Sequence, residues 1–283
     1  MSIEEHKIKV GALEWFYRVA EPIGRIDRLP VLLLHGLPSQ SYSWGEVMSS
    51  LAEKGFRAIA PDWIGFGFSS KPERREFAYT PDAFIQALAD FIEAVELEQF
   101  SLVVQGFLGS VGLQYALRYP DKIQRLVILN APVSTAAKLP WKIQQIGLPL
   151  VGEMLAQDPL LAERLLEGGS RYSIAEEDLA IYRKPFLKSS TAGRSLLATV
   201  RHLQIQQSMA EIEAGWRDWK QPTAILWGMK DPWLPFTLAQ QLSSSIPHAD
   251  LIQLEEAGHY AQEHWSQKVS DAIQLFLCRQ ANY

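Results

Sequence analysis

Cysteine is almost absent from this chain of 283 residues, with Cys278 the only one. One thiol can form no intramolecular disulfide and cannot build a thiolate metal cluster. Such cysteine usage is compatible with a reducing compartment. We expect no metal site and no other cofactor, and we expect Cys278 to be a core residue of the final helix.

Long apolar runs and an excess of basic residues are also missing. No run is long enough to span a bilayer, and the acidic segment Met-Ser-Ile-Glu-Glu-His-Lys lacks the apolar stretch of a secretory signal. The net charge of −5 gives no electrostatic reason to expect nucleic acid or an anionic membrane as a partner. The sequence therefore predicts a cytoplasmic globular protein, a monomer or weak homo-oligomer, whose partner is a small apolar molecule.

What the chain does contain is an alternation of strand-like and helix-like segments. A helix start is marked at Thr80-Pro81, where a capping hydroxyl precedes proline at the first helical position. This rhythm predicts an α/β protein with a mostly parallel sheet. The strand-like segments of the first half are 5–20 (a strand pair), 30–36, 56–61, 100–105 and 126–130.

The rhythm stops near residue 134 and resumes with the apolar run that begins at Pro222. The signals between these points are helical: Asp158-Pro159 is expected to begin a helix and Gly168-Gly169 to end it. We therefore predict a core domain made of residues 1–133 and 217–283, interrupted by a helical cap domain at 134–216.

Residues 102–112, Leu-Val-Val-Gln-Gly-Phe-Leu-Gly-Ser-Val-Gly, predict a buried strand that turns sharply into a helix. In many enzymes such a turn carries a nucleophile at its centre. Gly106 is at the centre here, and it has no side chain with which to form a covalent intermediate. Ser110 lies about one helical turn later and is expected to pack rather than to replace the nucleophile.

Several segments together resemble the α/β-hydrolase superfamily, in particular its branch of haloalkane dehalogenases and epoxide hydrolases. They occur in the order typical of that superfamily and extend over nearly the whole chain. The resemblance implies an α/β-hydrolase fold with an eight-stranded, mostly parallel sheet flanked by helices, an inserted helical cap and a site between the cap and the core. The segments are His35-Gly36-Leu37-Pro38, the loop from Ala60 to Ser69, the turn at 102–112, Tyr182-Arg183-Lys184-Pro185-Phe186, the run from Trp227 to Trp233, and Gly258-His259-Tyr260.

The resemblance further implies roles for four residues. Asp231 and His259 match the acid and the base of a catalytic triad, in which the carboxylate orients the imidazole. The backbone N–H groups of Leu37 and Phe107 match the oxyanion hole. Taken singly, Asp231 also fits a helix-capping Asp-Pro turn, and His259 fits an ordinary loop histidine.

Two reactions of this branch are disfavoured. Haloalkane dehalogenases need an aspartate at the centre of the turn, and usually a tryptophan after it and an asparagine in the His-Gly loop, whereas this chain has Gly106, Phe107 and Leu37. Epoxide hydrolases need the same aspartate together with two cap tyrosines. Without it, Tyr172 and Tyr182 are expected to pack or to line a pocket.

Two hypotheses remain open. One is a hydrolase or lyase for a small apolar carbonyl compound, in which the Asp231–His259 pair activates water or abstracts a proton without a covalent nucleophile. The other is an inactive pseudoenzyme that binds a hydrophobic ligand or a protein partner between cap and core. An engineered replacement at Gly106 is a third reading. The residues expected to line the pocket are Gln105, Trp141, Tyr182 and Phe186.

Overall fold

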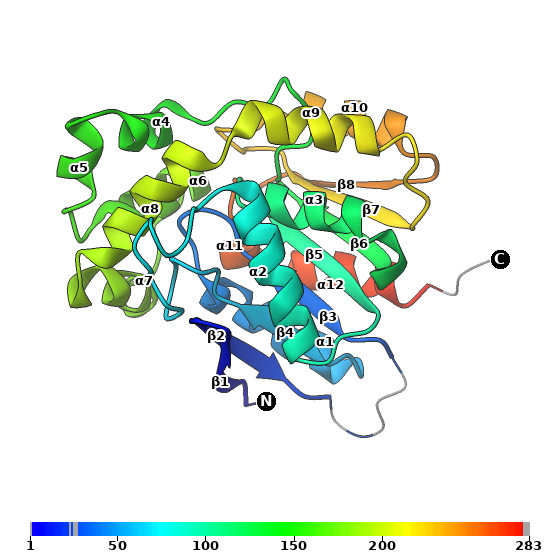
Figure 1. Cartoon of the computed structure of the whole chain (residues 1–283). Coiled ribbons are helices and arrows are strands. Elements are labelled where there is room, and N and C mark those ends of the chain that lie inside the picture. The colour runs from blue at the N-terminus through cyan, green and yellow to red at the C-terminus, as the bar shows by residue number, and fades with distance from the viewer. Residues whose placement is uncertain (1, 23, 25–27, 280–283) are drawn as a thin grey trace.

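Eight strands form one sheet in the order β1-β2-β4-β3-β5-β6-β7-β8 in the computed structural model, which describes residues 2–22, 24 and 28–279 (Figure 1). The β1–β2 and β2–β4 pairs are antiparallel, and the other pairs are parallel. The prediction of a mostly parallel sheet is therefore confirmed. The strands are β1 (Glu4–Val10), β2 (Leu13–Ala20), β3 (Val31–Leu34), β4 (Ala58–Pro61), β5 (Phe100–Gln105), β6 (Ile123–Leu129), β7 (Thr223–Gly228) and β8 (Asp250–Leu254).

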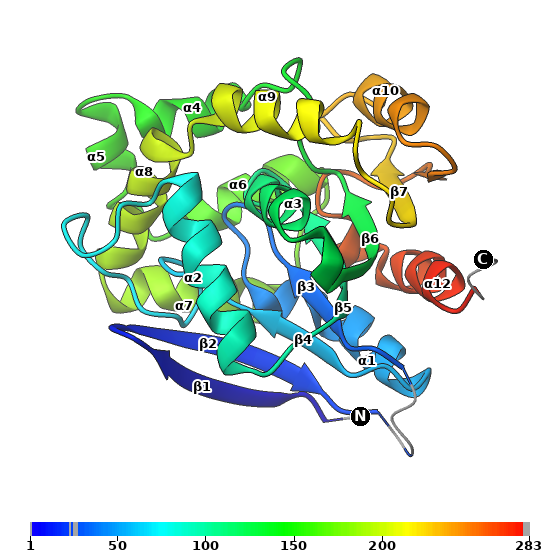
Figure 2. The same cartoon turned by 45° about the vertical axis from the view of Figure 1, so that its right-hand side comes forward.

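Helices cover both faces of the sheet, so its central strands carry apolar residues on both faces. In β3, Leu32 and Leu34 pack into one hydrophobic cluster, and Val31 and Leu33 pack into the other. Helices α2 and α3 lie on the first face, and α1 and α12 lie on the second (Figure 2). Their bounds are α1 (Gly45–Glu53), α2 (Pro81–Ala94), α3 (Gly109–Arg118) and α12 (Ser266–Leu277).

The start of α2 follows the predicted pattern. Thr80 is the N-cap, with its hydroxyl accepting a hydrogen bond from the amide of Ala83 at 3.4 Å, and Pro81 is the first helical residue. The cap satisfies one of the amides that a helix N-terminus leaves unpaired.

The chain between β6 and β7 is helical, and its helices α4 to α9 are called the inserted helices below. In Figure 1, α4, α5, α7 and α8 lie at the left of the molecule, and α9 runs along the top above α3. Their contacts with the rest of the chain include a hydrogen bond from the side chain of Gln40, in the loop after β3, to the carbonyl of Ile181 at 3.2 Å. The inserted helices are α4 (Trp141–Gly147), α5 (Val151–Leu155), α6 (Leu161–Ser170), α7 (Glu176–Lys188), α8 (Thr191–His202) and α9 (Ile205–Gly215).

The predicted end of α6 is wrong. Gly168 and Gly169 lie inside the helix, which ends at Ser170 with Arg171 in the left-handed conformation (φ 60°). Asp158 does prepare the start, since its carboxylate accepts a hydrogen bond from the amide of Leu160 at 3.0 Å. The role of Gly169 is instead a close contact with the core, described below.

The remaining helices are α10 (Thr237–Ser245) and α11 (Ala261–His264), which follow β7 and β8. The expectation of a core position for Cys278 is wrong, because its side chain is exposed at the end of α12. Within the described part of the chain, no helix combines the length and apolarity needed to cross a membrane.

Candidate active site

The turn after β5 is centred on Gly106, as the sequence predicts. Gly106 has a φ of +67°, in the left-handed region that favours glycine, and α3 begins three residues later. The backbone also passes very close to the loop after β3: a Cβ atom on Gly106 would lie 3.0 Å from the Cα of Gly36. Both the conformation and the close approach suit a residue without a side chain.

His259, in the loop after β8, faces this turn. Its Nε2 would lie 3.2 Å from a Cβ atom on Gly106. The same Nε2 is buried and has no hydrogen-bond partner within the described chain, whereas Nδ1 is 2.7 Å from Oδ2 of Asp231. Since Nδ1 donates to the carboxylate, the neutral ring has a free lone pair on Nε2. Buried polar atoms are normally paired, so this atom marks a site.

Asp231 follows β7 and is held by more than His259. Its Oδ1 accepts hydrogen bonds from the amides of Trp233 at 2.7 Å and Leu234 at 3.1 Å. Its Oδ2 accepts a further one from Nδ2 of Asn130 at 2.8 Å. The side chains of Asp231 and His259 are 1% and 0% exposed, so these bonds replace solvent as the means of stabilising the carboxylate.

Asn130 was not predicted as a site residue. It follows β6 with a φ of +41°, and its Oδ1 accepts a hydrogen bond from the amide of Gly228 at 2.8 Å. The side chain thus joins the end of β6 to the loop that carries Asp231. The only sequence signal is an asparagine directly after a buried strand, where asparagine tolerates a left-handed backbone.

Gln105 has a different place from the one expected. Its Oε1 accepts a hydrogen bond from the amide of Gly36 at 3.1 Å, and its Nε2 donates to the carbonyl of His259 at 2.9 Å. It lines none of the three pockets that the structure describes. Gln105 therefore connects the loop after β3 with the loop of His259.

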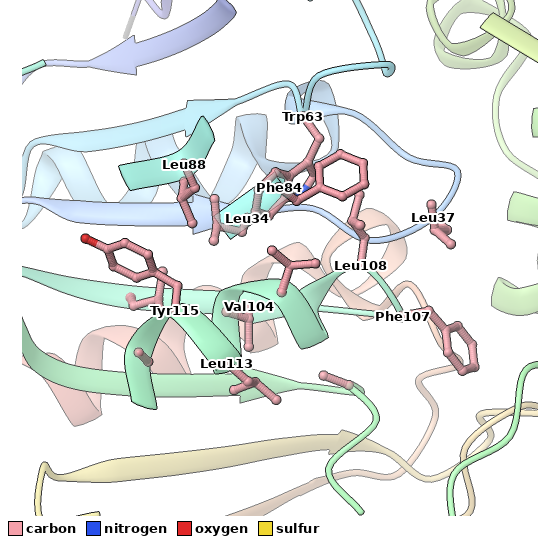
Figure 3. Close-up of a cluster of buried hydrophobic side chains, with 14 of the residues drawn as sticks. Leu34, Leu37, Trp63, Phe84, Leu88, Val104, Phe107, Leu108, Leu113 and Tyr115 are labelled. Atoms are coloured by element: carbon pink, nitrogen blue, oxygen red, sulfur yellow. The ribbon is translucent and has the colours of Figure 1, made fainter. Parts of the chain in front are cut away.

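Leu37 and Phe107 each lie one residue beyond the contact between Gly36 and Gly106. Neither backbone N–H has a hydrogen-bond acceptor within residues 2–22, 24 and 28–279. Both side chains are fully buried, and Figure 3 shows both residues beyond the ends of the strands that carry Leu34 and Val104. Two free amides beside a histidine have the composition of an oxyanion hole.

Aromatic rings and one inserted helix surround His259. The ring centroid of Phe107 is 5.5 Å from that of the imidazole in a stacked arrangement, and the centroid of Trp233 is 4.7 Å away. The amide of His259 donates to the carbonyl of Gly169 in α6 at 3.0 Å. The imidazole therefore lies in an apolar, water-poor space between the sheet and α6.

Of the other three residues expected to line the pocket, Tyr182 and Phe186 lie together, and Trp141 lies elsewhere. Tyr182 and Phe186 of α7 line a small cavity of about 10 Å³ beside Pro38, which is about the space that one water molecule needs. Trp141 is 63% exposed on the surface of α4, so the expectation that it lines the pocket is not supported. Its apolar character gave no information about which side of the helix would face the core.

The hydroxyl of Tyr182 donates a hydrogen bond to the carboxylate of Glu263 in α11. The pKa of Glu263 is raised to about 7, mainly by burial; the hydrogen bond from Tyr182 lowers it, and the negative charge of Asp178 adds a smaller increase. Tyr42 donates to Asp178 at 2.5 Å, which makes a second polar contact between α7 and the core.

Ser110 does not face His259. Its hydroxyl donates to the carbonyl of Phe107 at 2.8 Å, which leaves it engaged within the first turn of α3. Over the described residues, no group of three or more His, Cys, Asp or Glu side chains is arranged to hold a metal ion.

The sheet order, the strand-to-helix turn and the His–Asp pair that faces it define a protein of the α/β-hydrolase class. The family described as alpha/beta hydrolase fold matches residues 30–264, so the chain belongs to that family.

Curated relatives and solved structures agree with this assignment. The chain is 30% identical over 267 residues to a cis-3-alkyl-4-alkyloxetan-2-one decarboxylase of Shewanella oneidensis, covering 88% of this chain and 81% of the relative. It is 27% identical over 252 residues to haloalkane dehalogenase 2 of Mycobacterium tuberculosis, covering 86% of each chain. The crystal structure of haloalkane dehalogenase DbeA from Bradyrhizobium elkani superposes with a TM-score of 0.84 at 25% identity, covering 98% of each chain.

Proposed function

We propose that this protein is a hydrolase or lyase that acts on a small apolar carbonyl compound without a covalent nucleophile, and that Gly106 occupies the nucleophile position. The observation that carries the proposal is the buried Nε2 of His259, which has no hydrogen-bond partner within the described chain and faces Gly106. A protein that had lost all chemistry would gain nothing from keeping Asp231 bonded to that ring.

In the hydrolytic form of the proposal, His259 acts as a general base on water. The water oxygen bonds to the carbonyl carbon while its proton moves to Nε2, and the charged imidazole is stabilised by Asp231. The amides of Leu37 and Phe107 hold the oxyanion. The carbon–oxygen bond of the ester then breaks, and His259 returns the proton to the departing oxygen.

The relative from Shewanella oneidensis suggests the substrate class, because a 3-alkyl-4-alkyloxetan-2-one is a strained cyclic ester with two apolar alkyl substituents. Hydrolysis of a 3,4-dialkyl-oxetan-2-one would give a 3-hydroxy acid. The lyase outcome would instead break the C2–C3 and C4–O1 bonds of the ring, releasing carbon dioxide and an alkene without consuming water.

The test is turnover of 3,4-dialkyl-oxetan-2-ones and short acyl esters, with the products separated by mass spectrometry. We expect turnover by the unchanged chain and a loss of about 100-fold or more in His259→Ala, since general base catalysis contributes about 10²- to 10⁴-fold. His6→Ala, on the edge strand β1, is the matched control and should keep full activity. The proposal is wrong if no substrate turns over, or if both variants lose activity equally.

The second candidate is a pseudoenzyme that binds a small hydrophobic ligand or a protein partner. It is favoured by the close covering of His259, because none of the three described pockets is lined by His259, Asp231 or Gly106. Saturable binding of an apolar ester without any turnover, unchanged in His259→Ala, would support this candidate over the enzyme.

A further inference from the structure

A groove of about 750 Å³ lies between the β1–β2 ribbon, the loop at Gly67–Lys71 and helix α7. This volume is within the range of small-molecule sites. Its lining does not include His259, Asp231 or Gly106, although it shares Gly67, Lys71 and Pro185 with the small cavity beside Pro38.

Positive charge is concentrated in this groove, although the whole chain has a net charge of −5. The local excess of positive charge is expected to attract anions. The charged lining residues are five cations, Lys7, Arg18, Lys71, Lys184 and Lys188, and one carboxylate, Glu5.

Two of the five cations already have carboxylate partners. Arg18 is 2.8 Å from Glu5, and Lys7 is 2.5 Å from Glu14. Arg18 also donates to the hydroxyl of Ser41 at 2.6 Å, so its guanidinium is engaged on two sides. These pairs fix one wall of the groove and leave Lys71, Lys184 and Lys188 outside any ion pair of the described residues.

Lys71, Lys184 and Lys188 have no carboxylate partner in the described part of the chain. Lys71 donates to the carbonyl oxygens of Gly67 at 2.6 Å and Ser69 at 2.9 Å, which are neutral acceptors. The pKa of Lys71 is lowered to about 8, mainly because burial leaves its ammonium poorly solvated; the negative charge of Asp62 opposes this effect and the positive charge of Lys7 adds to it. A bound anion would offset that loss of solvation.

The floor of the groove is apolar and partly aromatic. The ring centroids of Phe16 and Phe68 are 5.2 Å apart, and Nζ of Lys184 lies 5.8 Å from the centre of the Phe68 ring. Ile181 and Pro185 of α7 face the same space. One site thus offers an apolar surface next to ammonium groups that form no ion pair, which matches a ligand with a hydrocarbon chain and one acidic end.

We propose that this groove is a second binding site, for a soluble aliphatic monocarboxylate, with the carboxylate among Lys71, Lys184 and Lys188 and the chain along Phe16 and Phe68. A carboxylate at the end of a hydrocarbon chain matches ammonium groups that lie next to an apolar floor. The guanidinium of Arg18, which could form a bidentate pair with a phosphate, is already engaged by Glu5 and Ser41.

The test is isothermal titration of the protein with monomeric decanoate. We expect saturable binding that weakens at least 10-fold in the double variant Lys184→Glu/Lys188→Glu, both of whose positions are exposed on α7. The matched control is Lys142→Glu, an exposed lysine of α4 outside the three described pockets, which should bind within twofold of the unchanged chain. Binding should also persist in His259→Ala, which separates this site from the candidate active site.

Two further ligands define the chemistry. Decan-1-ol, which keeps the chain and lacks the charge, should bind at least 10-fold more weakly than decanoate. Vesicles of anionic phospholipid test whether a membrane surface is the true source of the negative charge. The proposal is overturned if decanoate does not bind, if the alcohol binds equally well, if Lys142→Glu weakens binding as much as the α7 variant, or if the chain binds vesicles and not free decanoate.

Discussion

At the scale of single residues, the candidate site depends on a glycine position where a side chain would make close contacts with neighbouring atoms. A Cβ atom on Gly106 would meet both the backbone of Gly36 and the ring of His259. Nucleophiles on such turns are known to occupy strained backbone conformations. The turn can therefore accept a side chain only at a cost in stability.

Gly106→Ser tests this cost together with the position of His259. We expect the free energy of unfolding to fall by about 1–2 kcal/mol, because an L-residue is disfavoured at positive φ. The new hydroxyl would lie beside Nε2 of His259, so we expect a burst of acyl-enzyme formation with p-nitrophenyl acetate. Gly106→Ala is the matched control, with the same strain and no hydroxyl. A burst in both variants, or in neither, would contradict the proposed position.

Sequence alone predicted some of these residues and not others. Asp231 and His259 follow from their order and spacing in a known fold, and the structure places them 2.7 Å apart. The contacts of Asn130 and Gln105 could not be predicted in this way, because each side chain bonds to a segment that is about 100 or more residues away. Such contacts depend on side-chain reach in three dimensions, and neither spacing nor periodicity contains that information.

At the scale of elements, the contact between α7 and α11 depends on a carboxyl group that is poorly solvated. Burial raises the pKa of Glu263 from 4.5 to about 7. The folded chain therefore keeps a proton that the unfolded chain releases. The protonated Glu263 therefore stabilises the folded chain relative to its ionised form. This contribution to the free energy of unfolding is fully present below pH 4.5 and is lost as the pH rises through about 7.

Glu263→Gln should remove this pH dependence. We expect the free energy of unfolding of the unchanged chain to fall by up to about 3 kcal/mol from this group over that pH range. The free energy of unfolding of the glutamine variant should depend less on pH, because the amide does not titrate. The amide oxygen can still accept a hydrogen bond from Tyr182. The measurement is urea unfolding at several pH values. If the free energy of unfolding changes equally with pH in the two proteins, Glu263 does not titrate in this pH range.

Local signals predicted the type of element better than the contacts between elements. Thr80 and Pro81 begin α2 as expected because capping is decided within a few residues. The glycines of α6 were interpreted as a helix end because glycine usually terminates helices. Here glycine is needed at position 169 because the helix packs closely against Tyr260 and Trp233, which are distant in sequence.

At the scale of the whole molecule, the inserted helices cover the site through Gly169. A Cβ atom there would lie 2.6 Å from Cε2 of Tyr260 and 2.7 Å from Cη2 of Trp233. Gly168, the preceding residue, would meet only the flexible end of Lys142 at 3.6 Å. Two adjacent glycines of one helix therefore differ in how closely they approach the core.

Gly169→Ala should loosen the contact between α6 and the His259 loop. We expect the free energy of unfolding to fall by about 1–3 kcal/mol, as for other overpacked sites. Quenching of tryptophan fluorescence by acrylamide should increase as Trp233 becomes accessible. Gly168→Ala is the matched control and should be neutral or slightly stabilising, since alanine favours helix. Equal destabilisation by both changes would argue against a close contact at Gly169.

The overall fold was the most predictable level, because a central sheet covered on both faces requires apolar strands alternating with amphipathic helices. The eight-stranded sheet and its family are confirmed. The groove beside β1 was not predicted, since its lysines and aromatic rings come from separate parts of the chain.

The position of β1 at the rim of the sheet also affects how separate copies of the chain meet. An open edge strand exposes unpaired amides and carbonyls, to which a strand of another molecule can hydrogen-bond. Along β1 two negative charges, at Glu4 and Glu5, are followed by two positive charges, at Lys7 and Lys9. Two of these four groups are already paired across to β2, in the ion pairs Lys7–Glu14 and Glu5–Arg18. A strand added from another molecule would have to bring a matching charge pattern, so this rim is protected against aggregation.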